Sequence, residues 1–457
     1  MFFELSKYKP KAFLEEIKHL LGIGFPIYIA MVFLSGMGLV GTIITGQYNT
    51  DDLTAISLAN LLYFTAYLTI SSLIVALNPM LSQLLGAGKI EEVGELCRQG
   101  LLFSFLVSLV STVFWLLMIY PITLYLAYEN YDIYIQDTVK DYLIIITIAF
   151  PAAFLQRTLQ VYLTCVNKTK PIMLTAMVCF ILYIPLAYYL VVGVFGFEGR
   201  GGLGCAIALC IIFWLMFAIL AVFVVKDKFF NQFQLFYKWT NPDLGVFKEI
   251  SRIGAPILIA FFLEIGLFLT IILVIVPFGK VYVASQEIVS QVSNFLYMLP
   301  QSIGLASSVR IGYSIGEHKL LKARYISGVS ICLAILGSIL TALFLIVFNK
   351  HIAQIFSNDI EVIVLVRSIL VVVAFFQLSD AIQITVAGCL RGYKITKITM
   401  YANFISYWII GFGLGYYLGV VLDYRLEGFW IGMAIGITFC AILLTIYLQI
   451  VSKQCIK

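Results

Sequence analysis

The chain has 457 residues, of which 62% are hydrophobic and only 12% are charged, and its formal net charge at pH 7 is +5. Soluble domains contain about 45–50% apolar and about 25% charged residues, so soluble enzymes, nucleic-acid-binding proteins and disulfide-stapled secreted modules are excluded. A chain this apolar needs lipid as its solvent. Since one crossing takes about 20 residues, we expect an all-α integral membrane protein of roughly a dozen helices.

Twelve apolar segments follow one another along the chain, and most of them are joined by short polar connections. They cover residues 20–45, 53–79, 99–120, 141–165, 171–195, 203–225, 251–277, 282–311, 323–348, 362–390, 396–421 and 427–450. The longest connection, 227–250, is rich in lysine and asparagine and lies at the midpoint of the chain. The sequence therefore predicts a six-helix bundle over 1–226, a linker over 227–250 and a second six-helix bundle over 251–457.

The distribution of lysine and arginine predicts the orientation, because these residues are retained on the cytoplasmic side. With the N-terminus inside, the inner segments hold 22 of the 29 basic residues. The outer loops hold only Arg200, Lys280, Lys350 and Arg425. We therefore expect both termini and the 227–250 linker to be cytoplasmic, and the net positive charge to reflect topology rather than a nucleic-acid partner.

The two halves of the chain repeat each other with a constant numbering offset of 230. Residues 23–30 (IGFPIYIA) match residues 253–260 (IGAPILIA) at six of eight positions. The same offset pairs further glycine, tyrosine and lysine residues: Gly36 with Gly266, Tyr67 with Tyr297, Gly86 with Gly316, and Lys89 with Lys319. Six spans per half put both halves into the membrane from the same side, which makes this a parallel internal repeat. Two similar bundles joined by a linker suit transport by alternating access.

The sequence offers little to hold a resident cofactor. Nine cysteines are scattered without a CxxC pair, and three histidines lie far apart, so neither a disulfide framework nor a metal cage is indicated. The phosphate-binding loop of nucleotide-driven transporters is absent as well. We expect no cofactor.

Acidic residues inside the apolar segments are the leading candidates for function, because a charge in the bilayer is costly. Pro277 and Arg367 mark the outer ends of the two segments. Glu264 lies 13 residues before Pro277, and Asp380 lies 13 residues after Arg367. Every helical residue adds the same rise, so the two carboxylates reach the same depth, where they could share a cation or where one could hold a proton. Glu287 lies near the outer beginning of its segment. A solvated position and a place in the outer vestibule both remain open for it.

Several residues near these acids are candidates for binding an organic cation. Phe261 is three residues before Glu264 and shares its helix face, and aromatic rings hold cations by cation–π contact. Tyr297 is the strongest aromatic candidate, and Gln383 adds an amide within one turn of Asp380. Ordinary packing explains most of the other aromatic residues.

Together these residues resemble the multidrug and toxic compound extrusion (MATE) family, in its NorM-type bacterial branch, over nearly the whole chain. The resemblance rests on the two six-helix halves and on three motifs. These are residues 261–264 (FFLE), residues 298–304 (MLPQSIG), and residues 380–383 (DAIQ) continuing to 388–392 (GCLRG). It implies a protein of the bacterial inner membrane that exports cationic amphipathic compounds in exchange for Na⁺ or H⁺.

The resemblance also assigns roles to single residues. It places Glu264 and Asp380 on the cation-site acids of the family and Tyr297 on a position that contacts cation or drug. Relatives often carry a glutamine where this chain has Glu287. In the first span relatives have an aspartate where this chain has Gly41, so proton coupling through that acid cannot operate here. We therefore expect Na⁺ rather than H⁺ as the coupling ion, bound by Glu264 and Asp380.

Two other functions remain as alternatives. A flippase for lipid-linked saccharides resembles the same superfamily, but such flippases usually have a more basic central cavity than the acids found here. A membrane-embedded enzyme is the alternative of another class, and only the adjacent pair Asp51 and Asp52 suggests it. We expect small cationic drugs or toxins, the coupling ion and membrane lipid as partners, and a monomer.

Overall fold

The structure is a computed structural model that describes residues 10–193, 198–235 and 241–454. Within these residues the fold is all-helical, and ten helices are long and apolar enough to cross a membrane, or eleven when a bent pair counts as one span. The bent pair, α5 (Ile133–Thr147) and α6 (Phe150–Cys165), breaks by 46° within the predicted segment 141–165. The chain is an integral membrane protein with many spans.

The predicted segment 282–311 is the one that this count leaves out. It lies within α10 (Lys280–Gly316), a single helix of 37 residues. This helix is more polar than the others because it carries many serine and glutamine residues, including the buried Ser285 and Gln286. Within the described residues, each of the twelve predicted segments therefore falls on helical structure, and residues 194 and 195 of the segment 171–195 lie outside them.

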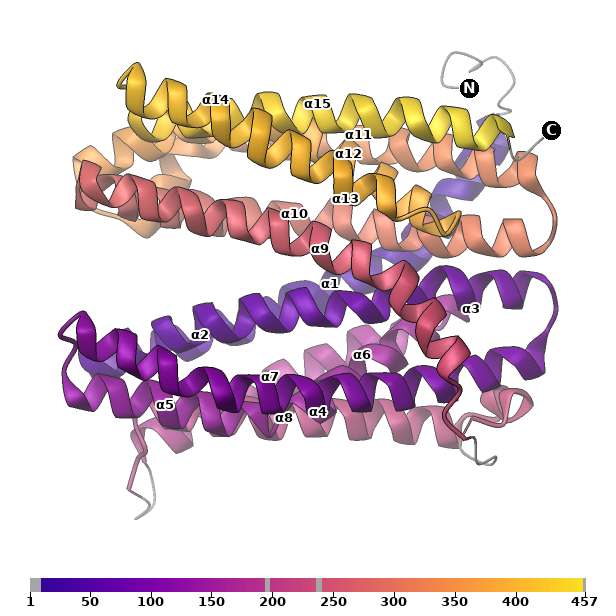
Figure 1. Cartoon of the computed structure of the whole chain (residues 1–457), viewed down its shortest axis with the longest axis horizontal. Coiled ribbons are helices and arrows are strands. Elements are labelled where there is room, and N and C mark those ends of the chain that lie inside the picture. The colour runs from indigo at the N-terminus through magenta and orange to yellow at the C-terminus, as the bar shows by residue number, and fades with distance from the viewer. Residues whose placement is uncertain (1–9, 194–197, 236–240, 455–457) are drawn as a thin grey trace. The chain divides into compact units, whose positions relative to one another are not determined.

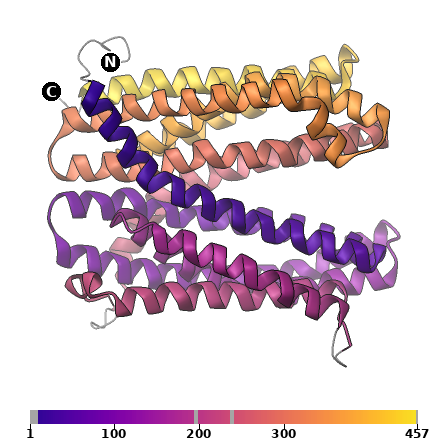
Figure 2. The same cartoon turned by 180° about the vertical axis from the view of Figure 1, so that it is seen from behind.

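The packing of the helices divides the chain into two compact units. The N-terminal unit holds residues 29–77 and 89–251, and the C-terminal unit holds residues 252–457 together with 1–28 and 78–88. One border between the units lies at residues 251 and 252, and two short stretches of the first half group with the C-terminal unit. The helix α1 (Pro10–Tyr48) runs without interruption through both units (Figure 2), and the change falls two residues after Pro26.

The N-terminal unit contains α2 (Thr50–Ser71), the 3₁₀ helix η2 (Ser72–Ala76), α4 (Ile90–Tyr128), α5, α6, α7 (Lys170–Val192), α8 (Gly202–Lys226) and the 3₁₀ helix η3 (Lys228–Phe233). The predicted linker is not an extended connection. Its first part forms η3, whose Phe230 and Phe233 are buried 5.8 and 5.7 Å from the ring of Tyr162. Its last part is the beginning of α9 (Leu244–Ile275). Residues 236–240 of the linker lie outside the described residues.

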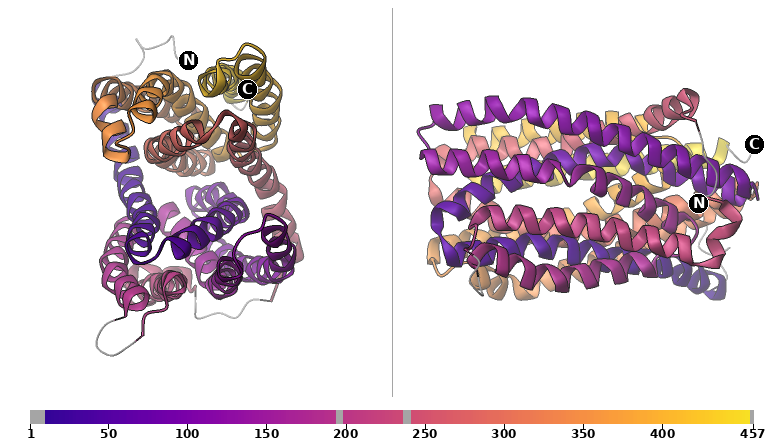
Figure 3. Two further views of the ribbon diagram at one scale, coloured as in Figure 1. Left: turned by 90° about the vertical axis from the view of Figure 1, so that its left-hand side faces the viewer. Right: turned by 90° about the horizontal axis from the view of Figure 1, so that it is seen from below.

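The C-terminal unit contains α3 (Leu77–Gly86) from residue 78 onward, α9 from residue 252 onward, η4 (Val276–Phe278), α10, α11 (Leu320–Phe356), α12 (Ile360–Gly392), α13 (Lys397–Asn403), η5 (Phe404–Phe412), α14 (Gly413–Tyr416), η6 (Tyr417–Val421) and α15 (Arg425–Gln454). Its long helices run along one common direction (Figure 1) and are seen end-on in the left panel of Figure 3. Phe376, Phe429 and Trp430 lie in its hydrophobic core. The stretches η5 and η6 are π-helical, a rare geometry that is frequent at functional sites.

A tight contact in this unit joins α3 to the end of α10. A Cβ atom on Gly86 would lie 2.0 Å from the backbone oxygen of Tyr313, and a Cβ atom on Gly316 would lie 2.0 Å from the backbone oxygen of Gln83. Only glycine allows the two backbones to approach this closely. The amide of Gln83 also donates to the backbone oxygen of Gly392 over 3.0 Å. These contacts explain why residues 78–88 group with the C-terminal unit.

Candidate functional site

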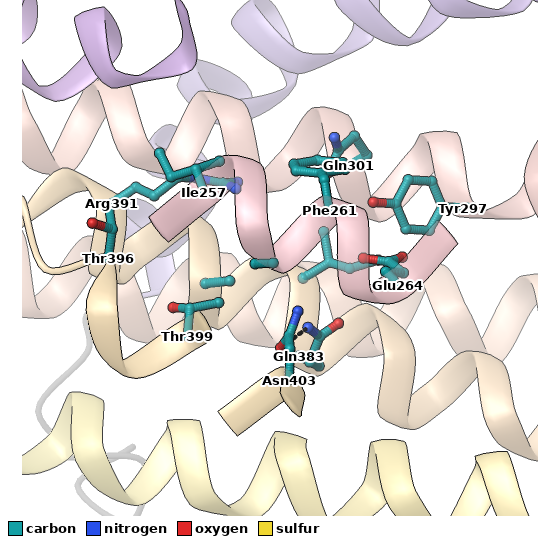
Figure 4. Close-up of a pocket in the computed structure, with 13 residues that line it drawn as sticks. Ile257, Phe261, Glu264, Tyr297, Gln301, Gln383, Arg391, Thr396, Thr399 and Asn403 are labelled. Carbon is teal, nitrogen blue, oxygen red and sulfur yellow. Dashed lines mark hydrogen bonds between the residues drawn. The ribbon is translucent and has the colours of Figure 1, made fainter. Parts of the chain in front are cut away.

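A polar pocket lies inside the C-terminal unit, between α9, α10, α12 and α13 (Figure 4). Its volume of about 30 Å³ is enough for about two water molecules or a single ion. It is lined by Ile257, Ala260, Phe261, Glu264, Tyr297, Gln301, Gln383, Ile384, Ala387, Arg391, Thr396, Thr399 and Asn403. Four of the residues singled out from the sequence, Phe261, Glu264, Tyr297 and Gln383, are therefore brought together here.

Glu264 is the acid that lines this pocket, and it comes from the middle of α9. The hydroxyl of Tyr297 on α10 is placed to donate a hydrogen bond to its carboxylate. Trp408 fixes α9 next to this carboxylate, because its indole N–H donates to the backbone oxygen of Leu263 over 3.0 Å. The π-helical η5, which carries Trp408, thus positions the neighbouring turn of α9.

Arg391 is a buried cation of the same pocket, and sequence reasoning missed it as a site residue. It lies near the end of α12, yet it is only 7% exposed and interacts electrostatically with Glu264. A signal was present in the spacing, because Gln383, Ala387 and Arg391 follow one another at four-residue intervals and so share one face of α12. Arg391 therefore brings a positive charge to the pocket that Glu264 lines.

Small residues allow α10 and α12 to lie close enough to form the pocket. A Cβ atom on Gly388 would lie 2.3 Å from the backbone oxygen of Gly304, so any larger residue at 388 would push the helices apart. Gly304 follows Gln301 by three positions and Gly388 precedes Arg391 by three. This crossing therefore sets the distance between pocket residues of the two helices.

Asp380 lies next to the pocket but does not line it. The residue is 3% exposed and its carboxylate interacts electrostatically with Glu264, so the two acids are near neighbours. One turn further along α12, the amide of Gln383 donates to the side-chain oxygen of Asn403 over 3.2 Å (Figure 4). Tyr407 on η5 is buried and interacts with both acids. Among the described residues, its hydroxyl has no hydrogen-bond partner.

Glu287 lies apart from this group. It is exposed, and its carboxylate accepts a hydrogen bond from the amide of Gln291 over 2.9 Å. The pocket does not include it. Its exposure is compatible with both positions that the sequence left open, the solvated one and the outer vestibule.

Gly41, the position where the family resemblance implies an aspartate, is surrounded by neutral groups. A Cβ atom there would lie 2.6 Å from the hydroxyl oxygen of Tyr183 and 3.5 Å from the sulfur of Cys205. The hydroxyl of Thr45 donates to the backbone oxygen of Gly41 over 2.9 Å and lies 3.3 Å from the same sulfur. Neutral groups of α1, α7 and α8 therefore fill the space that a longer side chain would need.

Comparison with known proteins gives consistent matches over the full length. The MatE family model matches twice, at residues 26–189 and 256–417. The chain is 36% identical to the probable multidrug resistance protein NorM of Neisseria meningitidis serogroup A, covering 100% of this chain and 99% of the relative. It is 32% identical to the multidrug resistance protein MdtK of Yersinia enterocolitica, with 97% of each chain covered.

Solved structures show the same fold at lower identity. The eukaryotic MATE transporter AtDTX14 superposes with a TM-score of 0.86 at 20% identity, covering 97% of this chain and 98% of that one. The Vibrio cholerae MATE transporter VcmN in its bent form gives a TM-score of 0.83 at 16% identity, with the same coverage of both chains.

The fold, the duplicated family match and the charged pocket within the spans define a membrane transporter of two repeated halves rather than an enzyme. The chain belongs to the MATE family. Membership excludes the membrane-enzyme alternative.

Proposed function

We propose that this chain is a secondary antiporter that exports cationic amphipathic compounds from the cytoplasm in exchange for a small cation. The names of its bacterial relatives, which are multidrug resistance proteins, support an efflux role. The lysine and arginine distribution supports an orientation with both termini cytoplasmic in the bacterial inner membrane. The protein acts as a monomer.

The observation that carries the proposal is a carboxylate, Glu264, in a membrane-embedded pocket of ion size, with a second carboxylate, Asp380, beside it. Hard cations such as Na⁺ prefer oxygen ligands, and the carboxylates together with the hydroxyl of Tyr297 and the amide oxygens of Gln301 and Gln383 supply them. An organic cation attracted by the same negative charge would compete with Na⁺. Arrival of one then favours release of the other, which is the coupling that an antiporter needs.

Phe261 and Tyr297 offer the aromatic surface for the organic cation. The positive charge of Arg391 lowers the net negative charge of the pocket. When both acids are ionised, the two carboxylates and Arg391 together carry one net negative charge. This charge matches one monovalent cation at a time.

Purified protein in lipid vesicles tests the proposal, with transport of the fluorescent cation ethidium followed under an imposed gradient of Na⁺ or of H⁺. We expect Na⁺ to drive transport at constant pH. Equal transport by a pH gradient in Na⁺-free buffer would replace Na⁺ by H⁺ as the coupling ion. No ethidium transport under either gradient, together with flipping of a labelled pyrophosphate lipid, would favour the flippase alternative instead.

A further inference from the structure

The N-terminal unit contains residues that correspond to those of the pocket, and the turns of the structure identify them. After α3, Gly88 has φ +72° and its N–H donates to the oxygen of Leu85, as His318 with φ +57° donates to Ile315 after α10. The numbers of these two turn residues differ by 230. With this offset of 230, Tyr67 is the counterpart of Tyr297, and the sequence repeat gives the same pair.

The turns after α6 and α12 are equivalent as well, with an offset of 227. Asn167 has φ +59° and donates to Thr164, and Lys394 has φ +60° and donates to Arg391. With this offset, Arg157 of α6 is the counterpart of Ile384 of α12.

The pocket residues of the C-terminal unit and the corresponding residues of the N-terminal unit have opposite charge. Gln160 takes the place of Ala387 with the same offset, and Ile384 and Ala387 both line the pocket of the C-terminal unit. The acids of that unit are replaced by apolar residues, since Leu34 corresponds to Glu264 and Ala153 to Asp380. The N-terminal unit therefore keeps the tyrosine and loses both carboxylates. Its guanidinium is at Arg157, whereas Thr164 takes the place of Arg391 with the same offset.

Arg157 lacks a counter-ion within the described residues. Its Nη1 donates to the side-chain oxygen of Gln160 over 3.3 Å, and its Nε, although buried, has no hydrogen-bond partner there. The titratable group that interacts with it is the Tyr67 hydroxyl, and no carboxylate of the described chain does so. Arg157 lies within α6, about two helical turns before the helix ends at Cys165. A guanidinium stays charged under all physiological conditions, and at this depth an uncompensated charge is costly.

We propose that Arg157 forms a binding site for an oxyanion in the N-terminal unit, assisted by the amide of Gln160 and the hydroxyl of Tyr67. The proposal rests on the function proposed above and extends it to the substrate class. The exported compounds favoured by this site carry a carboxylate, which Arg157 binds, in addition to the cationic group that the proposed function requires. Planar guanidinium groups suit carboxylates because they donate two parallel hydrogen bonds. An anionic lipid headgroup offers the same oxyanion chemistry and is the second source to be distinguished.

Two dyes with one chromophore test the site. Rhodamine 110 carries a carboxylate and a cationic ring system, and rhodamine 123 is its methyl ester, which is only cationic. Binding of both dyes to full-length protein is measured by fluorescence polarisation in detergent, and transport is measured in vesicles of neutral lipid. The variants are Arg157→Gln, the charge-conserving Arg157→Lys, and Arg200→Gln as a control for loss of one exposed positive charge in the same unit.

We expect Arg157→Gln to raise the Kd for rhodamine 110 at least about tenfold and to change the Kd for rhodamine 123 less than about twofold. Arg157→Lys should retain most of the preference, and Arg200→Gln should bind both dyes as the natural chain does. If neither dye responds but phosphatidylglycerol raises the thermal stability of the natural chain and not of Arg157→Gln, the oxyanion belongs to lipid. Equal responses of both dyes with no effect of phosphatidylglycerol would overturn the site. Absence of transport of rhodamine 123 by the natural chain would instead contradict the proposed efflux function, while the binding ratio still decides the role of Arg157.

Discussion

Alanine at Gly86 is expected to destabilise the contact between α3 and α10. The added Cβ atom would lie 2.0 Å from the backbone oxygen of Tyr313, whereas close carbon–oxygen contacts are about 3.3–3.6 Å, so the two backbones must separate by more than about 1 Å. Because the obstructing atom belongs to the backbone, no side-chain rotation relieves the clash. Overpacking of this kind costs about 1–3 kcal/mol.

The matched control is Gly38→Ala in α1. Gly38 is also helical, but an added Cβ atom there meets no atom within 4 Å. Since alanine is favoured over glycine in a helix by about 0.5–1 kcal/mol, this variant should be as stable as the natural chain or slightly more so. Thermal unfolding of the purified protein in detergent, with all variants in the same buffer, measures both effects.

The Gly316→Ala variant extends the test. Its added Cβ atom clashes at the same helix contact from the other side, with the backbone oxygen of Gln83. Once one methyl group has separated the helices, the second has less to displace, so the double variant should lose less stability than the sum of the two single losses. A Gly86→Ala protein as stable as Gly38→Ala would refute the reasoning. If the stability loss of the double variant equals the sum of the two single losses, the two alanines do not strain one shared contact.

Three further predictions follow from the site and the topology. Glu264→Gln and Asp380→Asn should each abolish ion-coupled efflux in vesicles without loss of membrane insertion, and near-normal efflux by both would exclude these acids as the coupling site. In a cysteine-free background of intact cells, Asn241→Cys should not react with a membrane-impermeant thiol reagent, and ready labelling would reverse the topology. Gly41→Ala should lower the unfolding temperature by overpacking against the hydroxyl of Tyr183 at a cost of about 1–3 kcal/mol; an unchanged midpoint would show that Tyr183 moves freely.

Much of the fold is predictable because lipid imposes one simple rule on the sequence. Each span must be apolar over about 20 residues, so twelve segments can be read directly, and the IGxP motifs reveal the repeat. The assignment of residues 78–88 to the C-terminal unit cannot be read in this way. It depends on close backbone approaches such as Gly86 to Tyr313, which join parts of the chain that are far apart in sequence.

The site was partly predictable for a related reason. Glu264 stands out because an acid in an apolar span is costly, and Tyr297 and Gln383 follow from their nearness to the acids. Arg391 did not stand out because it lies near the end of its helix, where basic residues are common for topological reasons. Its burial depends on the crossing of α10 and α12 at Gly388, which no property of the arginine itself reveals.

The contact between α3 and α10 has the form of an isologous interface, in which residue i touches j and the equivalent of j touches the equivalent of i. Gln83 and Gly86 meet Gly316 and Tyr313, which are their own counterparts in the repeat. Near the centre of the contact, position 82 faces its counterpart 312: a Cβ atom on Gly312 would lie 2.1 Å from the hydroxyl oxygen of Ser82. Two separate identical subunits would have to place the same residue on both sides of such an axis. A single chain that contains both halves escapes this restriction, so a serine on one side can occupy the space that a glycine leaves on the other.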